Sequence, residues 1–221
     1  MKKILILSVA FVLVGAVAVL YLAITKQKEK TENATINLES KVQSEELPKI
    51  EVAAMPNPEL FSPYAGDPIE NIGQDPFIQQ VPKDYLEKYK QELANFNNTL
   101  TENPGDAEAW VRVGVLKKFF NNYLGARDAW EYAKIVNPEF SIPYYNLGGL
   151  YAGYLKNNPK AEENYLKAIE VDPSSPYLYL GLAELYAVFY PEKANQAANV
   201  ILRGLKANPD EPSLIQALEN L

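Results

Sequence analysis

Four Asn-Pro or Asp-Pro pairs from residue 103 onward recur at nearly equal intervals, because their prolines are 34, 35 and 36 residues apart. Recurrence at a nearly fixed interval of this size is the sequence signature of stacked repeating units. Because proline cannot continue a helix, each pair is expected to mark the end of one unit. The four prolines are Pro104, Pro138, Pro173 and Pro209.

The same order of side-chain sizes recurs between successive prolines. Steps of three and four residues separate large from small side chains, so each unit is expected to form two short helices. A small residue lets the two backbones approach, and a bulky residue beside it fills the remaining space. The matching positions are Trp110, Gly114, Ala126, Trp130 and Ala133; Tyr144, Gly148, Ala161, Tyr165 and Ala168; and Tyr179, Ala183, Ala197, Ile201 and Gly204.

With these positions in place, the chain resembles the tetratricopeptide repeat (TPR) family, which has this period and this pattern of sizes. The resemblance covers roughly Asp106 to Pro209, about half of the chain. It implies an all-α fold, a short right-handed α-solenoid of about three helix-turn-helix repeats.

Two units depart from the family pattern. Lys117 stands where the other units carry tyrosine, and Ile201 and Gly204 replace the expected aromatic residue and alanine. The residues that lengthen the period fall in the turns between the two helices of a unit, at 156–159 and 190–193. Insertions cost little free energy in such turns.

The two ends of a repeat array need covering helices, because a terminal unit leaves an apolar face open. Apolar residues at helical spacing predict a leading helix over 83–103 and a capping helix over 210–221. The folded domain is therefore expected to span 83–221. Its repeats are expected at 104–138, 139–173 and 174–209.

An uncharged, mostly apolar run of 21 residues, Ile4 to Ile24, follows two lysines at the N-terminus. A run of this length can cross a bilayer, so residues 1–24 are interpreted as a transmembrane signal anchor in the cell membrane. The repeats are then expected on the extracytoplasmic side. A cleaved signal peptide is the alternative, because Ala16-Val17-Ala18 has the form of a cleavage site. Cleavage would give a secreted protein.

Residues 25–82 differ in composition and are interpreted as an acidic, Pro-rich and partly disordered tether. The part over 50–82 holds six prolines among many large apolar residues, more than a plain spacer requires. Two interpretations stay open for it. It is a disordered stalk, or it packs along the repeats and covers apolar surface until a partner displaces it.

The composition removes most catalytic chemistry. The chain has no His and no Cys, which excludes Ser-His-Asp and Cys-His catalysis and thiolate zinc sites. Adjacent carboxylates such as Glu162-Glu163 point in different directions on a helix and do not form an acid pair. We therefore expect no enzyme activity, no metal site and no cofactor.

The chain is acidic, with a net charge of -7 at pH 7. Phosphate binding requires a concentrated basic face, so nucleic acid is not an expected partner. The basic residues of the first repeat, Arg112, Lys117 and Lys118, are interpreted as solvated helix surface.

In the TPR family the first helix of each unit lines a concave groove, so the resemblance implies partner-binding residues on three helices. Some members hold an acidic peptide C-terminus with a clamp of Lys, Arg and Asn. Only Arg112 and Asn146 could contribute to such a clamp here, and a receptor for chaperone tails is not expected. The partner-binding residues are expected to be Arg112, Phe119, Tyr145, Asn146, Gly149, Tyr177, Leu180 and Glu184.

These features predict a membrane-anchored scaffold that binds an extended peptide or a partner helix in the groove. The alternative is a structural, oligomerising subunit of an envelope assembly, which would use the convex face and the ends of the solenoid. A secreted accessory protein or a carboxylate-based enzyme ranks third, because the sequence contains no paired-acid cleft.

Overall fold

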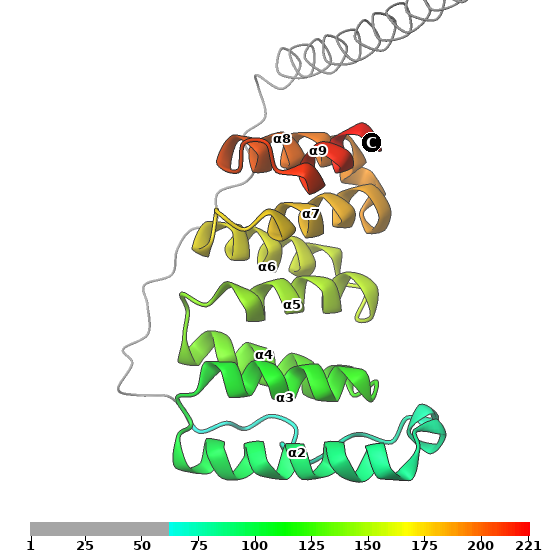
Figure 1. The fold of residues 1–221 in the computed structure, drawn as a ribbon, viewed down its shortest axis with the longest axis vertical. Coiled ribbons are helices and arrows are strands. Elements are labelled where there is room, and N and C mark those ends of the chain that lie inside the picture. Colours follow the sequence, from blue (N-terminus) through cyan, green and yellow to red (C-terminus); the bar gives the residue numbers. More distant parts are fainter. Residues whose placement is uncertain (1–61) are drawn as a thin grey trace, which may run out of the picture. The chain divides into compact units, whose positions relative to one another are not determined.

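The computed structural model describes residues 62–221, and in this part of the chain all regular structure is helical. The helices follow one another in chain order along the long axis of the view (Figure 1). The α-helices are α2 (Lys83–Glu102), α3 (Ala107–Phe119), α4 (Tyr123–Val136), α5 (Ser141–Gly153), α6 (Asn158–Val171), α7 (Pro176–Glu184), α8 (Ala197–Ala207) and α9 (Pro212–Glu219). Three shorter turns are η1 (Pro76–Gln80), η2 (Leu185–Phe189) and η3 (Pro191–Gln196).

Three helix pairs form the repeat-like part of the fold: α3 with α4, α5 with α6, and α7 with α8. Helix α2 precedes the first pair, and α9 follows the last. The all-α fold and the repeat-like packing expected from the sequence are therefore confirmed for the described residues.

Close contact between glycine and an aromatic ring holds each pair together. A Cβ atom on Gly114 would lie 2.3 Å from the Trp130 indole nitrogen, and one on Gly148 would lie 2.8 Å from the Tyr165 ring. The third pair reverses the arrangement, because Gly204 of α8 lies against the Tyr179 ring of α7. Real Cβ atoms do not approach other atoms this closely, so the rings occupy space that only glycine leaves free.

The four Asn-Pro or Asp-Pro turns share one conformation. The residue before each proline has φ between -140° and -130° and ψ between 76° and 92°, because proline excludes the helical conformation from its neighbour. In each turn the carbonyl of this residue accepts a hydrogen bond from the amide three residues later. The next helix is joined to two of the turns, since Trp110 donates to the Pro104 carbonyl and Tyr179 to that of Pro173, both at 2.9 Å.

The third pair is less regular than the other two. Helix α7 ends at Glu184 and continues as the π-helical turn η2, which the 3-10 turn η3 connects to α8. The longer third period is thus absorbed over residues 185–196 and not only in the predicted turn at 190–193. The buried Glu162 carboxylate holds this region to α6, because it accepts hydrogen bonds from Tyr186 and Lys193.

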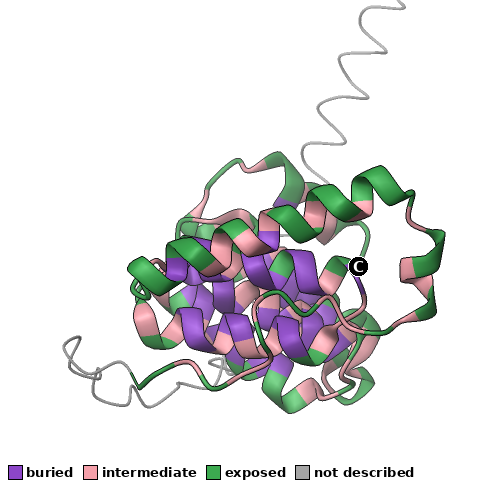
Figure 2. Ribbon diagram, turned by 90° about the horizontal axis from the view of Figure 1, so that it is seen from below, coloured by how far each residue is buried: buried purple, intermediate pink, exposed green. Residues whose placement is uncertain are grey.

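The buried residues are concentrated in the paired helices, whereas α2 carries mainly exposed and intermediate residues (Figure 2). Only two residues of α2 are buried, Leu93 and Leu100, and both contact the core beneath α3. Helix α2 alone therefore contributes a narrow apolar stripe to the N-terminal end of the stack.

The glycine contacts make a direct prediction about packing. Gly148→Ala should lower the free energy of unfolding by about 1–3 kcal/mol, because its Cβ would overlap the Tyr165 ring. Gly153→Ala is the matched control on the same helix, since a Cβ there meets open space. Urea unfolding of both variants measures the difference. Equal midpoints would contradict the assigned register of α5 and α6.

Candidate functional site

Residues 62–73, called the docked segment below, run between α2 and the α3–α4 pair (Figure 1). The segment has no helix of its own, yet it contacts both sides. On one side Asn97 of α2 donates to Glu70. On the other side residues of α3 and α4 bind its backbone and side chains. The packing that the sequence left open is thus present for this part of the Pro-rich region.

Lys117 of α3 is the centre of these contacts, and the prediction that it lies on a solvated surface is wrong. Its side chain is 0% exposed. The ammonium group pairs with the Asp67 carboxylate and donates to the carbonyls of Pro68, at 2.7 Å, and Asn71, at 2.8 Å. All three N–H groups of a charged lysine are therefore satisfied.

Further contacts hold Asp67 in place. Asn122 donates to its carboxylate at 2.9 Å, and the Asp67 amide donates to Asp128 at 3.2 Å. Burial raises the pKa of Asp67, but the hydrogen bonds from Lys117, Asn71 and Asn122 outweigh it, and the pKa lies below its ordinary value. Burial also lowers the pKa of Lys117, against the attraction of Asp67 and Asp128. The cost of burying the ammonium is thus offset only while the segment is docked.

An aromatic cluster completes the interface. The Tyr64 ring lies 4.5 Å from that of Trp110 and 5.3 Å from that of Tyr132, between ring centroids. Tyr132 also donates a hydrogen bond to the Ser62 carbonyl. The docked segment therefore covers, together with α2, the apolar end of the first helix pair, as a terminal repeat requires.

A second surface is formed by the outward faces of α3, α5 and α7 with η2, and is called the inner surface below. Large apolar side chains on it are 37–63% exposed, although such residues are usually buried in helical proteins. They are Val115, Phe119, Ile142, Tyr177 and Val188. Two of them, Phe119 and Tyr177, are among the expected partner-binding residues.

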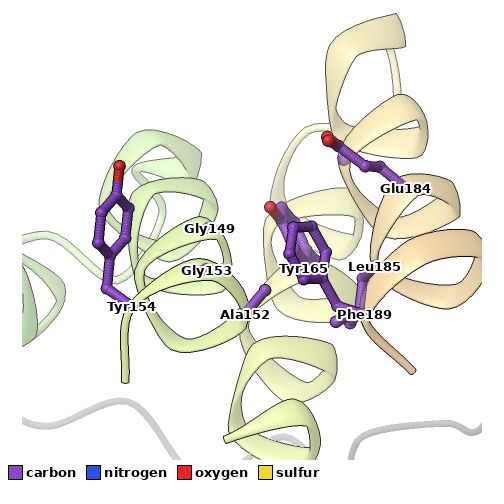
Figure 3. Close-up of a pocket in the computed structure, with 9 residues that line it drawn as sticks. Gly149, Ala152, Gly153, Tyr154, Tyr165, Glu184, Leu185 and Phe189 are labelled. Atoms are coloured by element: carbon purple, nitrogen blue, oxygen red, sulfur yellow. The ribbon is translucent and has the colours of Figure 1, made fainter. Parts of the chain in front are cut away.

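A cavity of about 410 Å³ lies on this surface between α5 and α7. Figure 3 shows the Tyr165 ring between the two helices, with Glu184 extending from α7 on the side to which the Tyr165 hydroxyl points. Two glycines of the wall, Gly149 and Gly153, are half-buried, so their backbone is partly accessible. The lining residues are Gly149, Ala152, Gly153, Tyr154, Tyr165, Gly181, Glu184, Leu185 and Phe189.

Three tyrosines meet beside this cavity. The Tyr145 ring lies 5.7 Å from that of Tyr165 and 5.0 Å from that of Tyr177. A Cβ on Gly181 would lie 2.7 Å from Tyr165 and 2.9 Å from Tyr145, so glycine is required where the rings converge. Burial raises the pKa of the Tyr145 hydroxyl, and the Glu184 carboxylate and Tyr177 raise it further. The hydroxyl is therefore neutral at physiological pH and available as a hydrogen-bond donor.

The cavity brings some of the predicted partner-binding residues together. Gly149 and Glu184 line it, and Tyr145 and Tyr177 stand beside it. Arg112 is exposed on α3, whereas Asn146 and Leu180 are half-buried and do not line the cavity.

Phe119, although part of the inner surface, does not line this cavity. It lines an apolar pocket of about 290 Å³ with residues of η1 and α2. Its ring lies 5.3 Å from that of Tyr89 and 5.8 Å from that of Phe77. The predicted site therefore divides into a central cavity and a separate pocket near α2.

Sequence reasoning missed three aromatic residues of the cavity. Tyr165 was assigned to packing within its helix pair, which is correct, but its edge also lines the cavity. Tyr154 and Phe189 lie just beyond the repeat positions that align between units. For Tyr154, the position directly after the first helix of its unit was the available signal.

The sequence matches no protein-family model and no curated protein. Within residues 62–221, no helix combines the length and the apolar character needed to cross a membrane. The expected anchor, residues 4–24, lies outside the described residues.

The buried ion pair predicts how the docked segment is held. Lys117→Met should lower the free energy of unfolding by about 2–3 kcal/mol, because Asp67 and two carbonyls lose their partner. It should also increase amide hydrogen exchange at Asp67 and Asn71. Lys88→Met, at an exposed position of α2, is the control and should change stability by less than about 0.5 kcal/mol. Unchanged exchange in Lys117→Met would show that the aromatic cluster alone holds the segment.

Proposed function

We propose that this protein is a membrane-anchored scaffold of the TPR type that holds an extended peptide or a partner helix on its inner surface. The observation that carries the proposal is the exposure of large apolar side chains on one face of successive first helices, beside a cavity of about 410 Å³. Exposed apolar surface that is continuous over several elements marks an interaction site.

The repeat geometry supports the assignment to the TPR type. The three pairs share glycine-to-ring contacts, and their connecting turns share one backbone conformation. In a solenoid built this way, the first helices form one continuous face. A partner that binds there can contact α3, α5 and α7 together. The proposal assigns no reaction to the surface.

The mixture of side chains on the inner surface favours a peptide with apolar side chains. Val115, Ile142 and Val188 offer apolar contact, whereas Tyr145 and Tyr177 offer rings with hydroxyl groups. Tyrosine at an interface supplies a large contact area together with a hydrogen-bond donor. The inner surface lacks the set of lysines that a clamp for acidic peptide ends would need.

A second candidate function is a structural subunit that associates through the outer face. Leu124 and Ile135 favour it, because both are large apolar residues exposed on α4, the second helix of its pair. Sedimentation of the full-length protein would test it. This function would be favoured if the protein forms a stable oligomer and the double variant Leu124→Glu, Ile135→Glu dissociates it. A monomer would exclude the function.

The groove proposal predicts a difference between two faces. Ile142→Glu combined with Val188→Glu should abolish crosslinking of a partner in native membranes, because two charges would enter an apolar contact. Since both side chains are exposed, the unfolding midpoint should stay nearly unchanged.

Leu124→Glu combined with Ile135→Glu is the matched control, with the same change at similar exposure on α4. It should leave the crosslinked product intact. Loss of the product in the control alone would assign partner binding to the other face.

The membrane part of the proposal places residues 4–24 in the bilayer and the repeats on the extracytoplasmic side. Protease added to intact cells should then digest residues 83–221. If the domain is instead protected from protease in intact cells, the repeats lie on the cytoplasmic side. Recovery of the protein in the medium would instead support signal cleavage and secretion.

A further inference from the structure

The cavity between α5 and α7 contains an unpaired negative charge. Glu184 is the only charged residue among those lining the cavity, and it forms no ion pair with another residue of 62–221. Other carboxylates near the helix pairs do have partners: Glu131 pairs with Lys134, and Glu162 with Lys193. The carboxylate of Glu184 is thus available to a group that comes from outside.

Aromatic rings surround the same position. Tyr165 lines the cavity beside Glu184 (Figure 3). The Tyr145 ring lies 5.7 Å from that of Tyr165, between ring centroids. Glu184 raises the pKa of the hydroxyl on both rings, after burial as the first cause, so its negative field reaches them. The face of an aromatic ring is itself negative and attracts cations.

Lysines of the chain already contact two of the rings that line the cavity. Lys118 lies 5.2 Å from the Tyr154 ring centroid, and Lys156 lies 5.8 Å from that of Phe189. These contacts give the Tyr154 and Phe189 rings a cation from within the chain. They leave the Glu184 side, with Tyr145 and Tyr165, as the place where a second positive group meets attraction and not repulsion.

We propose that this cavity receives an arginine or lysine side chain of the peptide held on the inner surface, with its charged group on Glu184 and its stem against the tyrosine rings. Arginine fits better, because a flat guanidinium both stacks on rings and binds a carboxylate through two N–H groups. The inference rests on the groove function proposed above and adds the chemistry of its ligand. The cavity, of about 410 Å³, leaves room for a long side chain.

A library of random dodecapeptides displayed on phage, selected on the full-length protein in detergent micelles, tests the inference. Bound peptides should share a basic residue at one position between apolar residues. Replacing that arginine by citrulline in a synthetic peptide should weaken binding by roughly fivefold to tenfold, as the loss of one ion pair and one ring contact implies. Selection on Glu184→Lys should enrich Asp or Glu at the same position.

Two variants separate charge recognition from folding. Glu184→Gln should weaken the arginine peptide as much as citrulline does and leave unfolding unchanged, because Glu184 is exposed and has no partner among residues 62–221. Glu108→Gln, an exposed carboxylate on α3, should leave binding unchanged.

The outcomes distinguish the inference from the function on which it rests. One outcome would overturn the inference and leave the groove function intact. In it, the selected peptides fail to bind the Ile142→Glu, Val188→Glu variant, but they share no basic residue or still bind Glu184→Gln. Peptides that the groove variant does not displace, or no enriched peptides at all, would overturn both.

Discussion

Each helix pair depends on one close contact, a glycine backbone against the face of an aromatic ring. Gly114 meets Trp130 and Gly148 meets Tyr165, and the Trp130 indole also donates to the Val111 carbonyl at 3.0 Å. Because the ring fills the space between the two helices, the large apolar side chains on the other face of the first helix find no room in the core. Their exposure on the inner surface is thus a consequence of how the pair is packed.

The contact also explains which parts of the fold could be predicted from the sequence. Side-chain sizes at positions three and four residues apart reflect packing within a helix pair. This spacing therefore predicted the pairs, their turns and the helices at both ends. The same information gave part of the cavity, since Gly149 and Glu184 follow from the helix register. It could not give Phe189, because the π-helical turn that places this ring departs from the regular spacing.

Lys117 shows the limit of periodic reasoning. Its position matches Tyr151 and Tyr186, and the sequence identified it as a departure from the pattern. Charged residues are seldom buried unless they are paired, and the pair partner, Asp67, lies 50 residues away in a region without periodicity. A lysine at a core position was the signal that a carboxylate had to approach from elsewhere.

The N-terminal end of the stack and the inner surface differ in whether the chain itself covers their apolar side chains. At the N-terminal end, Tyr64 and Asp67 of the chain itself cover the apolar face and neutralise a buried charge. Between α5 and α7 the apolar surface and the Glu184 charge stay open. The chain therefore covers exposed apolar surface at one end of the stack but leaves it uncovered on the inner surface. Apolar surface that stays exposed in this way is typical of an interaction site.

The docked segment has a consequence for the order in which the chain folds. The helix pairs form from residues about 20 positions apart, as with Val111 and Trp130, and can close soon after synthesis. The docked segment is made first, but Ser62 meets Tyr132 across 70 residues. The earliest residues of this unit to leave the ribosome must therefore wait for α3 and α4. The docked segment can therefore pack only after α3 and α4 have been synthesised.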